Sequence, residues 1–408
     1  MKKIIFLYMI VLSFKGAHSQ DLQTLIDEAL KNSPEIQQRE LQYRIASEQV
    51  KEVNTIGNTE LGLGYFVSEP ETRTGPQRFK VSARQMVPWF GAITARENYM
   101  GSLADAQYED VVISRRKLVA SVSQSYYRLY ALKAEETILK ENMELLKTYE
   151  TMALTAVRVS KASAVDVLRL QIRKNDLEKS EQILAQHFTA EQTVLNKLMN
   201  RDQSIAIIFS DSLVIPALPE PVSMENLQLH PELVKYDKLY GSVTQSELLS
   251  QKESGPVIGI GLDYINVTKR PDMTIVDNGK DILMPMVSMS IPVFNKSYRS
   301  KSRQHELKQQ ELAAQKQERM NALETLLQKA VTERNAAVIN YNTQSKNLDQ
   351  AKIAGTLLLK NYETGTISFN DLLDIQQMQL KFKMELVEAI KNYYLQQAII
   401  NYLSNTKY

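Results

Sequence analysis

The segment VDVLRLQ at residues 165–171 has a counterpart in NDLLDIQ at residues 370–376, which begins 205 positions later. Both segments place an aspartate before a run of apolar residues. Two further matches preserve the order at offsets of 197 and 204: PEI at 34–36 with PEL at 231–233, and VPWF at 87–90 with IPVF at 291–294. Three matches in the same order favour an internal duplication.

Helix-breaking residues are concentrated between long tracts that lack them. No proline lies between Pro88 and Pro216, and none follows Pro292. Proline removes a helical hydrogen bond, and glycine, which is also sparse in these tracts, costs about 1 kcal/mol in a helix interior. The tracts at 92–159 and 297–363 are therefore predicted to be single long helices that pack lengthwise against partners.

The partner of each long helix is expected just downstream, which gives helical hairpins at about 92–200 and 297–404. In the second hairpin tip, Gly365 can end a helix with positive φ, and Ser368 or Asn370 can cap the next helix. An acidic residue in the first turn of that helix is also favourable. These roles explain the tip as a structural feature and require no function.

Each half also contains a helix-like opening segment followed by alternating sequence. The opening segments are at about 22–55 and 224–252, and strands are expected at about 60–67, 79–87, 256–266 and 283–293. Large apolar residues alternate there with small or polar ones, which is the strand period. An ordinary half-buried sheet and a membrane barrel share this pattern, so the strands alone leave both interpretations open.

The string Tyr362-x-x-Gly365-x-x-Ser368-x-x-Asp371-Leu372-Leu373-Asp374-x-Gln376, taken with the duplication and the strand pairs, resembles the TolC-like outer-membrane efflux proteins. The resemblance covers essentially everything after residue 19. It implies a mainly α protein with a membrane β-barrel, in which three chains form a twelve-stranded barrel that a periplasmic α-helical barrel continues.

Strand number also bears on the oligomer. Four strands cannot close a barrel, and their free edges are not tolerated in lipid. Two chains would give eight strands, whose side chains nearly fill the interior, whereas three chains leave room for a conduit. A trimer is the smallest assembly with a useful pore, and the resemblance implies the same number.

The resemblance assigns a periplasmic gate to Asp371 and Asp374, which match acidic positions that ring the tunnel entrance in the family. Gate or hairpin-tip contacts are expected at Tyr362, Gly365, Ser368 and Asp166. The first half departs from this pattern, with Ser160 in place of Gly365 and Arg169 in place of Asp374. A solvated pair of helix N-terminal carboxylates is the alternative reading of Asp371 and Asp374.

Barrel-to-helix corners are expected where the strands lead into the long helices. The corner residues are Pro88, Trp89, Gly91, Pro292 and Phe294. The segment QMVPWFG at 85–91 is similar to that of heavy-metal-resistance members, and Trp89 is typical of an aromatic side chain at a membrane interface.

Residues 1–19 are predicted to be a cleaved secretory signal, because two lysines precede a short apolar run that ends near a small-residue cleavage site. The remaining chain is divided into a first repeat at 20–200, a connecting equatorial belt at 201–223 and a second repeat at 224–408. The resemblance places the protein in the outer membrane with a periplasmic extension.

Composition argues against several functions. The chain has no cysteine and a formal net charge of +2, so cysteine chemistry is excluded and nothing indicates nucleic acid. His187, His230 and His305 are widely separated, and neither a catalytic triad nor a phosphate loop is recognisable. No catalytic residue, metal site or cofactor is predicted.

The function that the sequence favours is a passive exit duct. The resemblance implies a homotrimer that contacts outer-membrane lipid, a periplasmic adaptor and an inner-membrane pump, expected to be of the RND type. The alternative is a soluble periplasmic coiled-coil adaptor or structural rod without channel activity.

Overall fold

The computed structural model describes residues 21–159, 163–209, 213–216, 225–272, 274–293, 296–364 and 367–404. The predicted signal at 1–19 and the predicted site residues Gly365 and Phe294 lie outside these ranges.

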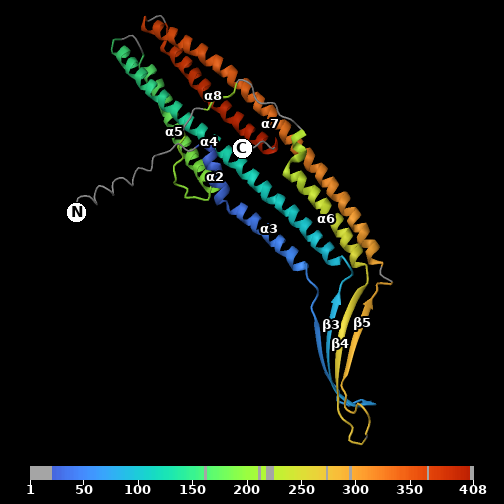
Figure 1. The fold of residues 1–408 in the computed structure, drawn as a ribbon. Coiled ribbons are helices and arrows are strands. Elements are labelled where there is room, and N and C mark those ends of the chain that lie inside the picture. Colours follow the sequence, from blue (N-terminus) through green and yellow to red (C-terminus); the bar gives the residue numbers. More distant parts are fainter. Residues whose placement is uncertain are drawn as a thin grey trace, which may run out of the picture. The chain divides into compact units, whose positions relative to one another are not determined.

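Helices make up most of the described chain, which confirms the mainly α prediction (Figure 1). They are α2 (Leu22–Asn32), α3 (Pro34–Val53), α4 (Ala92–Arg158), α5 (Ala164–Leu198), the 3-10 helix η1 (Glu225–Leu229), α6 (Pro231–Glu253), α7 (Ser297–Glu363) and α8 (Phe369–Ser404). Both α4 and α7 contain 67 residues, as the scarcity of helix breakers suggests. Within the part of the chain that the structure describes, no helix has the length and apolar character needed to cross a membrane.

The two opening helical segments differ from expectation because each is interrupted at a proline. Ser33 separates α2 from α3, and Pro34 is the first residue of α3. Proline has no N–H to continue a preceding helix but suits the first helical position. His230 likewise separates η1 from α6, which begins at Pro231.

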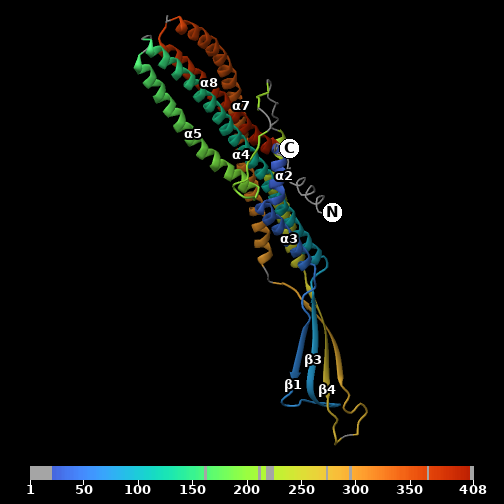
Figure 2. The ribbon, with the colours of Figure 1, turned by 90° about the vertical axis from the view of Figure 1, so that its left-hand side faces the viewer.

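The chain divides into two compact units. One contains Gln38–Val112 and Pro231–Met320, and it holds an antiparallel sheet in the order β1-β3-β4-β5 (Figures 1 and 2). The strands are β1 (Glu60–Tyr65), β2 (Glu71–Thr72), β3 (Gly75–Val87), β4 (Val257–Val267) and β5 (Ile282–Ser290). The short β2, which the sequence pattern did not indicate, pairs with β3. The central pair β3–β4 joins strands from the two halves of the chain.

The other unit holds the described residues up to Gln37, together with Ile113–His230 and the chain from Asn321 onward. In it, α4 lies beside α5 and α7 beside α8 (Figure 2). One apolar core packs α2 against α4 and the end of α5 around Leu25, Leu129 and Leu195. A second core packs the ends of the two helical hairpins together.

In the sheet-containing unit, α6 and α7 are joined through Glu247. The carboxylate of Glu247 pairs with His305 Nδ1 at 2.6 Å and accepts a hydrogen bond from Ser302 Oγ at 2.8 Å. The hydrogen bond from His305 is the main reason that the pKa of Glu247 lies below its ordinary value of 4.5, and the bond from Ser302 adds to it. The ionised form of Glu247 therefore stabilises the contact between these helices.

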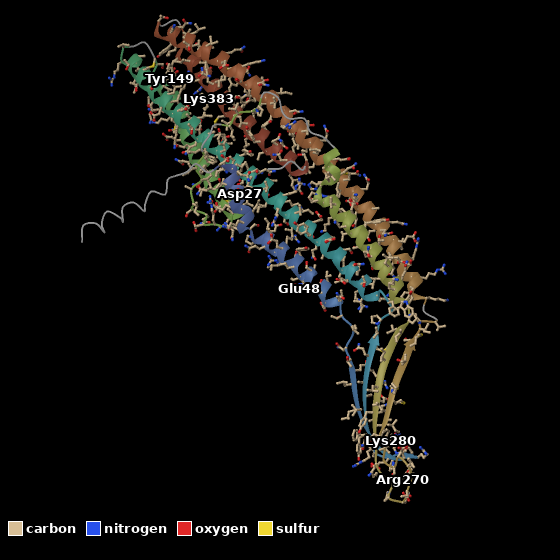
Figure 3. All side chains as sticks on the ribbon, viewed as in Figure 1. Asp27, Glu48, Tyr149, Arg270, Lys280 and Lys383 are labelled. Atoms are coloured by element: carbon tan, nitrogen blue, oxygen red, sulfur yellow. The ribbon has the colours of Figure 1, made fainter. Side chains whose placement is uncertain are left out.

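Because its pKa is lowered on folding, Glu247 stabilises the protein above the unfolded-state pKa near 4.5, and this contribution is lost as pH falls through the folded-state value. We expect Glu247→Gln to lower thermal stability at neutral pH and to reduce the further loss on acidification. Thermal unfolding between about pH 7 and about pH 3 measures both effects. The control is Glu48→Gln: Glu48 lies on α3 (Figure 3) and, among the described residues, forms an ion pair only with Lys51 of the same helix. Equal pH profiles for Glu247→Gln and the wild type would contradict this role.

Candidate functional site

The N-terminus of α5 is capped at the tip of the first hairpin. Ser163 Oγ accepts a hydrogen bond from the backbone N–H of Val165 at 3.2 Å, and the Ser163 N–H donates to Asp166 Oδ2 at 3.2 Å. This reciprocal arrangement is a capping box. Asp166 therefore has a structural role at the predicted tip.

The same residue types occur at the start of α8. The N–H and the hydroxyl of Ser368 both donate to Asp371 Oδ2, at 3.2 and 3.1 Å. Of the two predicted capping residues, Ser368 is the one that precedes the helix, whereas Asn370 lies inside it. Asp371 thus has a local partner, and its charge also lies where the helix dipole favours an anion.

Asp374, the second predicted gate residue, pairs with an arginine of the first hairpin. Arg173 of α5 donates to Asp374 Oδ1 at 3.1 Å and to the backbone oxygen of Leu373 at 3.0 Å. Arg169, one turn earlier, donates to the side chain of Asn370. The Asp374 side chain remains 72% exposed, so the ion pair contributes at most about 1 kcal/mol and leaves the carboxylate open to solvent.

Sequence reasoning noted Arg169 as a departure from the duplicated pattern but missed Arg173. The available signal was the four-residue spacing of the two arginines, which places both on one helix face. Their partners are about 200 residues away in the sequence, so the spacing could not identify them.

The tip contacts lie over an apolar core from four helices. Phe369, Leu372 and Leu373 are almost completely buried there, and Phe369 contacts the rings of Tyr149 and Tyr362. The Tyr362 hydroxyl is buried and has no hydrogen-bond partner among the described residues. Burial, with the charge of Asp166 adding to it, raises the pKa of Tyr362 above its ordinary value of 10.0. The predicted residues Asp166, Tyr362, Ser368, Asp371 and Asp374 thus belong to one region of the helical unit.

The predicted corner residues lie in the sheet-containing unit. Gly91 has φ of +80°, a conformation that favours glycine, immediately before α4 begins. Trp89 packs against Gly255, where an added Cβ would lie 2.8 Å from the indole ring. Trp89 is partly buried by this contact, whereas the neighbouring Phe90 is 78% exposed. Pro292, at the second corner, is partly buried.

Strand register separates the sheet into two chemically different faces. Leu63 pairs with Val81, which pairs with Tyr264, so these residues lie on one face of the sheet. We define the apolar face by its exposed large residues: Leu61, Leu63, Tyr65, Val81, Ile260, Leu262, Leu283, Val287 and Met289. Such an extensive exposed apolar surface indicates an apolar environment or a partner.

The opposite face combines small and polar residues with several large apolar ones, namely Met86, Ile265, Met284 and Met286. We define the polar face by Gly62, Gly64, Lys80, Ser82, Arg84, Gly259, Gly261, Asp263 and Ser288. Alternation of an apolar with a polar face occurs both in half-buried sheets and in membrane barrels.

No metal centre is found in the described ranges, where no group of three or more acidic or histidine side chains could hold a metal ion. The site candidates are the hairpin tip in one unit and the two-faced sheet in the other.

Sequence comparisons find no matching family model and no matching curated protein. Solved structures do match. The chain is similar to CusC, whose crystal structures are reported to concern conformational changes that accompany folding and transmembrane channel formation. The identity is 14% and the TM-score is 0.76, and the match covers 94% of this chain and 92% of CusC. It is similar to the outer membrane protein VceC of Vibrio cholerae, with 16% identity, a TM-score of 0.73, and coverage of 94% and 96%.

A third similar structure is the open state of the MtrE outer membrane channel of Neisseria gonorrhoeae, with 16% identity, a TM-score of 0.74, and coverage of 94% and 88%. At such low identity the likeness shows the fold. The chain has the fold shared by these outer-membrane channels, and this is the fold that its resemblance to the TolC-like proteins implies.

The caps give a direct test of the tip geometry. Replacing Ser163 or Ser368 by alanine removes side-chain capping contacts, at a cost of about 0.5–2 kcal/mol to the local helix end. We expect faster amide hydrogen exchange in the first turn of α5 or α8, respectively, measured by mass spectrometry. Thr356→Ala, which lies inside α7 about two turns before its end, is the control. Unchanged exchange at both helix starts would show that the caps contribute nothing to the tip.

Proposed function

We propose that this chain is a TolC-like outer-membrane exit duct of a tripartite efflux system. The observation that carries the proposal is the sheet with one exposed apolar face and one polar face, in a chain that has the fold of outer-membrane channels. The apolar face contacts lipid and the polar face lines a water-filled passage.

The edges of the sheet support a homotrimer. Within the described residues, β1 and β5 each pair with a strand on one side only. In lipid, unpaired backbone groups cost several kcal/mol each, so these edges require partners. We propose that β1 of one copy pairs with β5 of the next, and that three copies close a twelve-stranded barrel.

The helices are proposed to form a periplasmic α-helical barrel that continues the passage. Residues 20–200 and 224–408 act as two repeats, and 201–223 acts as the connecting belt. Asn196 binds the backbone oxygens of Gln203 and Ile205, and Tyr394 binds that of Val214. These bonds attach the described parts of the belt to α5 and α8.

The hairpin tip is proposed to be the periplasmic gate. Three copies of Asp371 and Asp374 around a narrow mouth would attract cations and repel anions. Arg173 moderates this field because it pairs with Asp374 at 3.1 Å. Tyr362, Ser368 and Asp166 position the gate through packing and capping.

The duct is passive in this proposal and needs no cofactor. An inner-membrane pump, of the RND type, supplies energy and selects the cargo, and a periplasmic adaptor contacts the hairpin tips. The lipid of the outer membrane surrounds the barrel.

Conductance of the purified protein in planar bilayers tests the duct and its gate together. We expect discrete channels, with higher conductance or weaker cation preference for the double variant Asp371→Ala, Asp374→Ala, because acidic charge is removed from the mouth. Arg173→Gln should strengthen cation preference, because it leaves Asp374 without its partner.

The double variant Asp176→Ala, Asp349→Ala is the control, since it removes two exposed acidic residues from the helices. Wild-type conductance and selectivity in the gate variants would contradict the gate. Folded protein that never forms channels would contradict the duct and favour the periplasmic rod.

A further inference from the structure

The polar face of the sheet contains a buried acidic group. Asp263 of β4 is 0% exposed and pairs with the Nζ of Lys80 on β3, whose side chain is 30% exposed. Beyond this ion pair, neither carboxylate oxygen has a hydrogen-bond partner among the described residues. A buried carboxylate is costly unless it is compensated, so the ion pair with Lys80 offsets the cost of burying Asp263.

Register explains how the two side chains meet. The residues directly opposite Asp263 are Ser82 on β3 and Met284 on β5. Lys80 therefore reaches Asp263 diagonally, a separation that long side chains can bridge. Because the pair crosses between β3 and β4, it joins strands from the two halves of the chain.

Glycines leave space for the side chains of β3 on the polar face. Gly64 lies opposite Lys80, and an added Cβ there would meet no atom within 4 Å. Gly261 lies opposite Arg84, and its added Cβ would be 3.4 Å from the Cγ of that arginine. The basic side chains of β3 thus lie beside strand positions that have no side chain of their own.

The charges on this face occur in opposite-sign combinations. Glu60 of β1 stands directly opposite Arg84 in the register, and Asp263 pairs with Lys80. In the Lys80–Asp263 pair, Asp263 is fully buried, whereas part of the Lys80 side chain is exposed to solvent. Solvent at this face contacts part of the Lys80 side chain, and the carboxylate of Asp263 reduces the field of the lysine ammonium group.

From this geometry we infer that Lys80 and Asp263 together determine the ion selectivity of the strand-lined section of the duct. The inference rests on the proposed function, because it requires the polar face to line the passage. In a trimer the pair occurs three times around the passage. The passage is narrow and its protein wall has a low dielectric constant, so an uncompensated charge there acts strongly on a passing ion. The intact pair keeps this section close to neutral, so charged substrates of either sign can pass.

Reversal potentials in a potassium chloride gradient across a planar bilayer test the pair. Asp263→Asn leaves three uncompensated cations and should raise the chloride-to-potassium permeability ratio at least about twofold. Lys80→Gln removes the cations and should leave the ratio at or below the wild-type value. The double variant Lys80→Gln, Asp263→Asn should return close to the wild-type ratio. The control is the double variant Asp277→Asn, Lys280→Gln. It neutralises an exposed ion pair outside the strands, of which Lys280 is labelled in Figure 3.

A second design avoids an unpaired charge during folding. Since the chain has no cysteine, the variant Lys80→Cys, Asp263→Asn carries one thiol in a neutral background. Its thiolate displaces the sulfinate leaving group of a methanethiosulfonate reagent and forms a mixed disulfide. A cationic reagent added to open channels should shift selectivity toward chloride, and an anionic reagent should shift it toward potassium.

Wild-type selectivity in both single variants, with no shift after either label, would overturn the inference and leave the pair a purely structural contact. Failure of the proposed function itself would look different, because the wild-type protein would then form no channels.

Discussion

The antiparallel pairing of β3 with β4 is the interaction on which the rest of the structure depends. It joins strands from the two halves of the chain, and its register sets which side chains share a face. A slip of one residue would move Leu262 to the polar face and Asp263 to the apolar face. The Lys80–Asp263 ion pair opposes such a slip, because a displaced carboxylate would enter the apolar surface without a partner.

The sheet edges and the helices follow from this pairing. With β3 and β4 in the centre, β1 and β5 become the outer strands, and their free edges account for the proposed closure between copies. The strands β3 and β5 are followed by α4 and α7, which end at hairpin tips. At the tips, the ends of the two hairpins share one apolar core. The polar surface over it carries the hydrogen bonds of Asp166 and Asp371 and the Arg173–Asp374 ion pair.

Local sequence signals predicted the elements well and the contacts between them poorly. The absence of breakers indicated α4 and α7, and alternation indicated the four longer strands, since both signals act within one element. The breaks at Pro34 and Pro231 could have been placed by the same reasoning. Arg173 and Lys80 could not be assigned partners, because Asp374 and Asp263 lie more than 180 residues further along the chain. The burial of Trp89 likewise depends on Gly255 in the other half.

Cysteine cross-linking across the free strand edges tests the central claim most directly. Double variants would place one cysteine on β1, at Leu61 or Leu63, and one on β5, at Val287 or Met289, in a chain that has no other thiol. Within one copy, three strand spacings of about 4.8 Å keep the two thiols too far apart for a disulfide. Oxidation should give covalent dimers and trimers and nothing larger. Only monomers from every double variant in membranes would contradict the closed barrel.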